Sequence, residues 1–248
     1  MLNTLARYWI VSRSIFTTWF WSLIAMSVII PGLRSRQRSN YFVRTWSASL
    51  LRIIDLDYQV FNPHNVKFEP GKHYIVMCNH SSLYDIPLSV MAIDGSVRML
   101  AKKELRHIPI FGYAMAKNEF LFIDRKNRNQ AIKDLKLAAE KMRSGIILWI
   151  APEGTRSRDG RLLPFKKGGF MLAIETGATI VPLGIRGAID IVEPRTFKVK
   201  RGQHAEMHIG QPIDASAYTL EQRDALMEKV RAAISEVAAV GRLPGFHR

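Results

Sequence analysis

The strongest constraint on the fold is an alternation, beyond residue 60, of short apolar runs with longer segments of helical periodicity. This alternation is typical of α/β proteins, in which helices cover a central sheet. We therefore expect an α/β fold with a mixed, mostly parallel central sheet flanked by helices. The predicted strands are residues 73–78, 97–101, 120–123, 145–150, 179–185, 197–200 and 205–209.

Two later segments carry helix signals. Residues 129–145 have apolar side chains at helical spacing and end at Gly145, which suits a glycine cap. The last helix is predicted to begin at Thr219, with Gln222 as its capping-box partner, and to run to about Val240. The predicted apolar face of the first of these helices comprises Ile132, Leu135, Ala139 and Met142.

The first 60 residues have a different character. Residues 14–33 form a stretch without charge that, as a helix, spans roughly 30 Å. Hydroxyl side chains along it, Pro31 near its end and two internal tryptophans argue against a simple membrane crossing. Residues 41–54 separate apolar from basic positions as an amphipathic helix does, although an ordinary core helix is the alternative. We expect residues 1–60 to form two membrane-associating helices and residues 61–248 to form the α/β domain.

The chain is basic, with 36 Lys and Arg against 21 Asp and Glu and a net charge of +15. This excess favours an anionic partner, such as nucleic acid, an acidic carrier, a phosphorylated substrate or an anionic membrane. The single cysteine, Cys78, excludes an intramolecular disulfide.

The stretch "CNHSSLYDIP", Cys78 to Pro87, follows a predicted strand and opens a predicted helix. His80 would then lie on the connecting turn and Asp85 in the first helical turn. A carboxylate bonded to one imidazole nitrogen fixes the tautomer, so that the other nitrogen can remove a proton from a hydroxyl. The alternative is structural, because Ser82-x-x-Asp85 is also a capping box.

Basic residues follow two further predicted strands. Arg125 ends "FIDR", and "APEGTRS" contains Glu153, Gly154, Thr155 and Arg156. Ligands gather at the carboxyl ends of strands in α/β sheets, so these segments are expected to converge on the histidine. An arginine fork suits phosphate oxygens, and Glu153 is expected to hold a guanidinium in place. The combination predicts a base beside a phosphate site.

The four blocks "NHSSLYD", "FLFIDR", "APEGTRS" and "IVPLGI", in this order between about residues 70 and 190, resemble the glycerolipid acyltransferases. In particular, the sequence resembles the lysophosphatidic acid (1-acyl-glycerol-3-phosphate) acyltransferases, and "AKKEL…IPIFG" is similar to their stretch between the first two blocks. The resemblance implies His80 as general base and Asp85 as its orienting carboxylate. It assigns phosphate recognition to Arg125, Glu153, Gly154, Thr155 and Arg156, and a role in shaping the acyl-donor site to Pro182. Ala151 departs from the aromatic residue of many members, which we expect to affect packing.

The resemblance also implies the reaction. A fatty acyl group would pass from acyl-CoA or acyl-carrier protein to the sn-2 hydroxyl of lysophosphatidic acid, giving phosphatidic acid. Lyso-ornithine lipid or another lysophospholipid is the alternative acceptor. No metal or other cofactor and no nucleic acid is expected to take part. The partners would be membrane lipids and the two substrates, and the place of action the cytoplasmic face of the inner membrane.

Other constellations have simpler explanations. Cys78 as a thiolate nucleophile is less expected than a small buried side chain. His204, Glu206 and His208 alternate as metal ligands can, but also as the polar face of a strand does. A hydrolase lacks support because no G-x-S-x-G elbow is present, and a silent membrane-binding module remains a rival that variants of His80 would identify.

Overall fold

The computed structural model describes residues 2–29, 32–33, 35–192, 196 and 198–238. Two long helices, α1 (Leu2–Ile29) and α2 (Arg36–Ile53), precede the sheet. The strands are β1 (Asp57–Phe61), β2 (Tyr74–Cys78), β3 (Val97–Lys102), β4 (Leu121–Ile123), β5 (Ile147–Ile150), β6 (Thr179–Arg186), β7 (His204–Ile209) and β8 (Ile213–Asp214). Further helices are α3 (Asp85–Ala92), α4 (Phe111–Lys117), α5 (Arg128–Arg143), α6 (Gly168–Thr176), α7 (Ala188–Ile191) and α8 (Arg223–Ala238), with 3₁₀ turns η1 (Lys103–His107) and η2 (Ala215–Ala217).

The strands form one sheet in the order β1-β7-β6-β2-β5-β3-β4, with β8 pairing β6. Pairing is parallel except where β6 meets β7 and β8. The predicted mixed, mostly parallel sheet flanked by helices is therefore confirmed. The four adjacent parallel strands β2, β5, β3 and β4 end side by side, which sets up a shared edge for loop residues.

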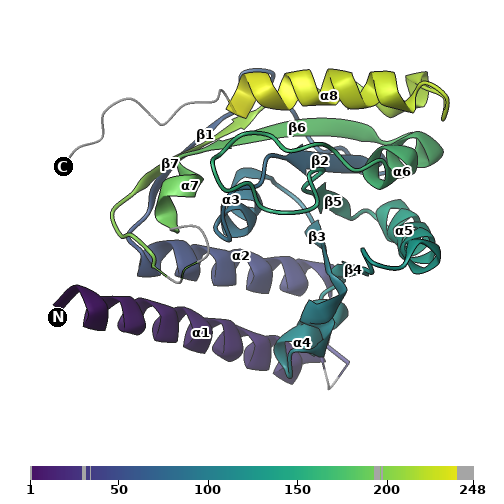
Figure 1. Ribbon diagram of the computed structural model, residues 1–248. Coiled ribbons are helices and arrows are strands. Elements are labelled where there is room, and N and C mark those ends of the chain that lie inside the picture. The colour runs from purple at the N-terminus through teal and green to yellow at the C-terminus, as the bar shows by residue number, and fades with distance from the viewer. Residues whose placement is uncertain (1, 30–31, 34, 193–195, 197, 239–248) are drawn as a thin grey trace.

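Two apolar cores lie on the two faces of this sheet, because successive side chains of a strand point to opposite faces. In β2, Val76 and Cys78 pack with α2, α3 and α7, whereas Ile75 and Met77 pack with α5, α6 and α8. Figure 1 shows α1 and α2 running antiparallel below the sheet and α8 crossing its opposite face. All five residues of β2 are buried, as expected for a central strand of a parallel sheet.

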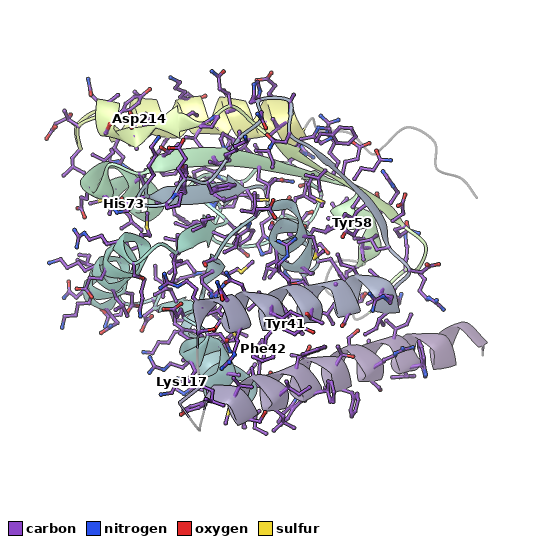
Figure 2. All side chains as sticks on the ribbon, turned by 180° about the vertical axis from the view of Figure 1, so that it is seen from behind. Tyr41, Phe42, Tyr58, His73, Lys117 and Asp214 are labelled. Atoms are coloured by element: carbon purple, nitrogen blue, oxygen red, sulfur yellow. The ribbon has the colours of Figure 1, made fainter. Side chains whose placement is uncertain are left out.

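The predicted apolar positions of residues 41–54 are buried only in part. Ile53 and Ile54 are buried, whereas Tyr41 is 61% exposed. The buried stripe of α2 also includes Ser39, Val43, Ser47 and Leu51, four residues apart. The small serines allow α2 to lie close to its neighbours, and Ser47 donates to the carbonyl of Val43 at 2.8 Å. Phe42 projects between α2 and α1, where its ring lies 6.5 Å from that of Trp21 (Figure 2).

No helix in the described part of the chain has the length and apolar character needed to cross a membrane. The assignment of residues 1–60 to membrane association therefore stays a prediction. The predicted domain division at residue 60 also stays a prediction, although β1, which pairs with β7, already begins at Asp57.

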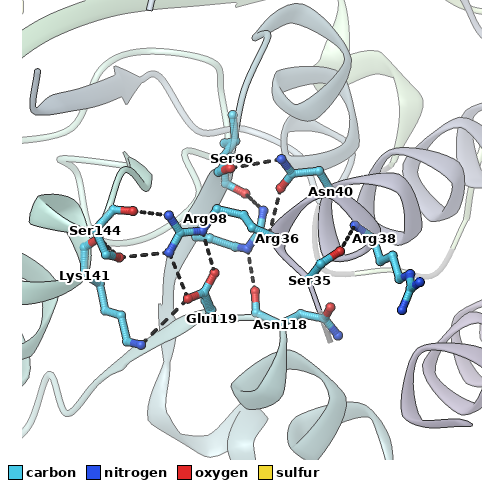
Figure 3. A network of polar contacts seen from close by, with 11 residues as sticks. Ser35, Arg36, Arg38, Asn40, Ser96, Arg98, Asn118, Glu119, Lys141 and Ser144 are labelled. Carbon is cyan, nitrogen blue, oxygen red and sulfur yellow. Dashed lines mark hydrogen bonds and ion pairs between the residues drawn. The ribbon is translucent and has the colours of Figure 1, made fainter. Parts of the chain in front are cut away.

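A partly buried polar network, with Arg98 and Glu119 at its buried end, joins the start of α2 to the rest of the protein (Figure 3). The Arg36 guanidinium makes two hydrogen bonds of 3.1 Å to the Glu119 carboxylate, and Lys141 lies 3.8 Å from the same group. Nearby, the buried Arg98 donates to the Asn118 carbonyl and to the Asn40 side chain. Because buried charges are stable only when paired, this network fixes the position of α2.

Several local predictions need correction. Residues 198–200 form no strand; Val199 makes only an isolated bridge to Val192, and residue 197 lies outside the described residues. Ile132 is 46% exposed, and the buried face of α5 comprises Ala138 and Met142, with Leu135 and Ala139 partly buried.

The last helix begins at Arg223 rather than Thr219, although Thr219 N–H does donate to the Gln222 side chain at 3.0 Å. Its predicted end at Val240 lies outside the described residues. The predicted glycine cap of α5 agrees with the positive φ of 93° at Gly145.

Candidate active site

The predicted site residues follow the carboxyl ends of neighbouring strands. His80 follows β2, Glu153 and Arg156 follow β5, and Arg125 follows β4. Asn79 fixes the end of β2, because its side-chain amide exchanges two hydrogen bonds, of 2.9 and 2.8 Å, with the backbone of Ile185 in β6. The sheet thus carries the histidine on a rigid, buried support.

His80 and Asp85 are in direct contact, as predicted. The His80 Nδ1 lies 2.8 Å from Asp85 Oδ2, and Asp85 is fully buried. With Nδ1–H donating to the carboxylate, Nε2 is left as the free base of the imidazole. The ring of His80 also meets the indole of Trp149 edge to face, with centroids 5.8 Å apart. The pair has the geometry of an oriented general base.

The same carboxylate also bonds the loop before the helix, but the predicted capping box is only half formed, because Ser82 Oγ accepts the N–H of Tyr84 at 3.3 Å and not that of Asp85. Asp85 Oδ2 accepts the backbone N–H groups of Ser81 and Ser82 at 2.7 and 2.8 Å. These bonds hold the loop in a curve that returns the histidine ring to the carboxylate. A carboxylate at Nδ1 stabilises the imidazolium that forms when Nε2 accepts a proton.

A second chain of hydrogen bonds supports the pair from behind. Trp149 Nε1–H donates to Ser89 Oγ at 2.9 Å, and the Ser89 hydroxyl donates to the Asp85 carbonyl at 2.7 Å. All three residues are buried. Trp149 therefore connects the histidine ring, which it touches, to the first turn of α3.

Glu153 lies behind the wall of the site and not beside an arginine. Its side chain is 1% exposed, and its two oxygens accept the backbone N–H groups of His80 and Leu163, each at 2.9 Å. Burial raises the pKa of Glu153 above its ordinary value. The expectation that Glu153 holds a guanidinium is wrong for both Arg125 and Arg156, since neither pairs with it among the described contacts. Its geometry is that of a brace for the histidine loop.

Arg125 and Gly154 meet at the mouth of the site. The Arg125 guanidinium donates to the Gly154 carbonyl, and burial lowers its pKa from the usual value. Gly154 has a φ of 71°, which a side chain would strain, so the tight turn requires glycine. Arg156 is exposed and lines the same cavity, whereas Thr155 is exposed but does not line it.

His80, Arg125, Gly154 and Arg156 border a cavity of about 700 Å³. Its wall is mostly apolar and extends from His80 and Trp149 to the amino-terminal helices, where Trp21, Phe42 and Trp46 contribute. An apolar cavity with few convergent polar groups is the usual form of a small-molecule site. Its size and lining suit an aliphatic chain whose reactive end lies at the histidine.

Sequence reasoning missed two basic residues of this cavity, Lys102 at the end of β3 and Lys166 before α6. Lys102 could have been found by the rule that gave Arg125, because it ends a strand; Lys166 follows no strand end directly, so that rule could not have found it. Gly168 and Gly169, the first residues of α6, also line the cavity and add the positive end of a helix. The polar end of the cavity is thus positive.

Pro182 does not reach the cavity. It lies within the buried strand β6, opposite Met77 of β2, and its carbonyl accepts the Gly210 N–H at 2.8 Å. The expected role in shaping the acyl-donor site stays a prediction, and Pro182 would act on that site through neighbouring residues.

The structure also places the residues that were considered as a thiolate nucleophile or as metal ligands. Cys78 is fully buried, and burial raises the pKa of its thiol well above the ordinary value. No group of three metal-binding side chains occurs among the described residues. His208 instead bonds Glu206 at 2.8 Å and stacks on Phe61, and His204 bonds Asp57 at 2.7 Å.

Comparisons with known proteins identify the family of the chain. A family model described as "Acyltransferase" matches residues 59–186. The 1-acyl-sn-glycerol-3-phosphate acyltransferase of Saccharomyces cerevisiae is 34% identical over 182 residues, which are 72% of this chain and 59% of that protein. An uncharacterised acyltransferase of Schizosaccharomyces pombe is 31% identical over 186 residues, 74% of this chain and 66% of that protein. The chain thus spans less than two thirds of the length of these two relatives.

A solved structure extends the likeness to almost the whole chain. The crystal structure of the 1-acyl-sn-glycerophosphate (LPA) acyltransferase PlsC from Thermotoga maritima superposes with a TM-score of 0.73 at 26% identity, covering 98% of this chain and 97% of that one. The family match includes the loops that carry His80, Asp85, Arg125 and Arg156. By its fold, its sequence and its His-Asp pair, the chain belongs to the acyltransferase family.

Proposed function

We propose that the protein transfers a fatty acyl group from acyl-CoA or acyl-carrier protein to the sn-2 hydroxyl of lysophosphatidic acid, giving phosphatidic acid for phospholipid synthesis. The observation that carries the proposal is the oriented His80–Asp85 pair in the wall of an apolar cavity with a basic end. The relatives named as acylglycerol-phosphate acyltransferases support the same substrate class.

The proposed mechanism is a direct acyl transfer. Nε2 of His80 removes the proton of the acceptor hydroxyl, and the oxygen attacks the thioester carbonyl carbon. The tetrahedral intermediate collapses as the carbon–sulfur bond breaks, and the leaving thiolate takes the proton from the imidazolium. Asp85 keeps the imidazole in the reactive tautomer and stabilises its charged form.

The acceptor phosphate is proposed to lie against Arg125 and Arg156. Their guanidinium groups border the cavity on the loops that follow β4 and β5, the same edge of the sheet from which His80 projects. Lys102, Lys166 and the start of α6 add positive charge around it. The reaction needs no metal or other cofactor in this mechanism.

The protein is further proposed to work at the cytoplasmic face of the inner membrane. The amino-terminal helix α1 exposes large aromatic side chains, among them Tyr8, Trp9, Phe16 and Phe20. Such side chains favour the membrane interface, and the net charge of +15 favours anionic lipid. Association of the purified protein with anionic vesicles in a flotation experiment tests this placement, and its failure to float with them would contradict it.

The central experiment measures transfer of a labelled acyl group from acyl-CoA and from acyl-carrier protein to lysophosphatidate, monoacylglycerol and lyso-ornithine lipid. The parent protein and His80→Ala are compared. Phosphatidate formation by the parent alone is expected. Transfer only to an acceptor without phosphate would support the acyl-transfer mechanism but refute the assignment of lysophosphatidate as the acceptor. Equal activity of both proteins would show that His80 has only a structural role.

A further inference from the structure

A second, smaller cavity lies beside the first and has no place in the mechanism so far. Its volume is about 420 Å³, and it lies between α1, the loop that carries the catalytic pair, and the segment before α4. Ile15 and Trp19 of α1, Leu50 of α2, Pro87 of α3 and Ile108 contribute apolar side chains to it.

Of the hydroxyl groups on this wall, that of Thr18 is bonded within the protein, whereas the buried Ser14 hydroxyl has no hydrogen-bond partner in the described part of the chain. The Thr18 hydroxyl donates to the Ser14 carbonyl at 2.9 Å and accepts the Trp46 indole N–H at 3.1 Å. No charged side chain lines the cavity among the described residues. Its chemistry therefore suits a hydrocarbon chain and not a phosphate.

The two cavities share a boundary formed by Leu83 and Phe111, which line both. Leu83 belongs to the loop between His80 and Asp85, and its side chain is 53% exposed. One short loop therefore presents the histidine to the larger cavity and Leu83 with Tyr84 to the smaller one. A molecule that reacts at the histidine can thus extend a chain past Leu83.

We propose that this second cavity binds the alkyl chain of the lyso-lipid acceptor, while the larger cavity holds the acyl chain of the donor. The inference rests on the proposed function, in which two aliphatic chains must meet at His80. The chain and the phosphate of the acceptor leave its glycerol backbone from opposite ends. Arg125 and Arg156 border only the larger cavity, and the smaller one begins across the histidine loop, at Leu83. The acceptor can therefore place its phosphate on one side of this loop and its alkyl chain on the other.

The test fills the second cavity and leaves the first unchanged. Ile15→Trp adds an indole to its wall, and Leu23→Trp is the matched control, because both residues are about half exposed on α1 and Leu23 lines neither cavity. Initial rates are measured with hexanoyl and palmitoyl acceptors against one donor, and then with donors of increasing chain length against one acceptor.

The expected result is a KM for the palmitoyl acceptor that rises about sixteenfold in Ile15→Trp, because the indole keeps about two methylene groups from the cavity and each of them weakens binding by about fourfold. The hexanoyl acceptor, the donor chain-length profile and the Leu23→Trp control should keep their parental values. A change in the donor profile would show that the cavity holds the donor chain, and unchanged kinetics would show that it holds neither; both results overturn the proposal.

A second measurement does not depend on a folded variant. A palmitoyl-type acceptor with a photoreactive diazirine at the end of its chain is expected to label the parent protein at residues 14–19, and labelling confined to residues around Trp46 would contradict the proposal. Failure of the proposed function is distinguishable, because the parent would then not acylate lysophosphatidate at all. The same variants and probe would in that case be applied to the lyso-lipid that it does acylate.

Discussion

Replacing Glu153 by alanine separates a structural brace from a substrate ligand. The carboxylate accepts the N–H groups of His80 and Leu163 in a site that is 1% exposed. An orphaned buried donor costs about 1–3 kcal/mol, and Leu163 is only partly buried, so the loss of stability should be about 2–4 kcal/mol. For a chain of this size that lowers the Tm by about 4–16 °C.

The assay is thermal unfolding of the purified protein in detergent, together with kcat and KM for transfer. We expect Glu153→Ala to lower kcat as well, since its loss frees the histidine loop. Asp159→Ala is the control, because Asp159 also accepts a backbone N–H, that of Arg161 at 3.1 Å, but in an exposed position. Its Tm should fall by no more than about 2 °C. A parental Tm in Glu153→Ala, with only the KM of the phosphate-bearing acceptor raised, would refute the reasoning and make Glu153 a determinant of phosphate binding.

Three other changes test the surroundings of the base. Trp149→Phe removes the N–H that Ser89 accepts but keeps a ring beside His80, so kcat should fall about fivefold at unchanged KM; a change in KM alone would count against a positioning role. Cys78→Ala should retain activity, and the native thiol, whose pKa burial raises, should resist alkylation at mildly alkaline pH; near-complete loss of activity in the folded variant would revive a thiolate nucleophile. Because burial raises the pKa of Glu153 above 4.5, the folded state binds this proton more tightly than the unfolded chain. The free energy of unfolding of the parent, relative to that of Glu153→Gln, should therefore fall as the pH rises above about 4.5. Denaturant unfolding curves at several pH values measure this difference, and an increase with pH would contradict the prediction.

The sheet and the catalytic pair could be predicted because both depend on local patterns. Strands such as 74–78 and 147–150 are short, wholly apolar and bounded by polar turns. His80 and Asp85 lie within one loop, so their contact needs no long-range information. Arg125 and Arg156 could be placed because parallel strands end at a common edge.

The errors concern partners that are distant in the sequence. Strand β1 has an exposed, polar pattern and exists because it pairs with β7, which lies more than a hundred residues later. The partners of Glu153 are backbone N–H groups, and a sequence pattern does not indicate them because every residue except proline has such a group. The buried stripe of α2 contains Ser39 and Ser47, because close packing selected small side chains where a hydrophobicity pattern looks for large ones.

The polar network at the start of α2 means that the amino-terminal helices cannot be removed as a separable unit. A chain shortened to begin at β1 would lose Arg36 and Asn40, and Glu119, now held at 7% side-chain exposure, would lose its bidentate partner. It would also lose Phe42 and Trp46 from the wall of the larger cavity. Attempts to obtain a smaller soluble fragment should therefore yield aggregated, inactive protein. The amino-terminal helices and the sheet therefore form one folding unit, which shares both a polar network and a cavity wall.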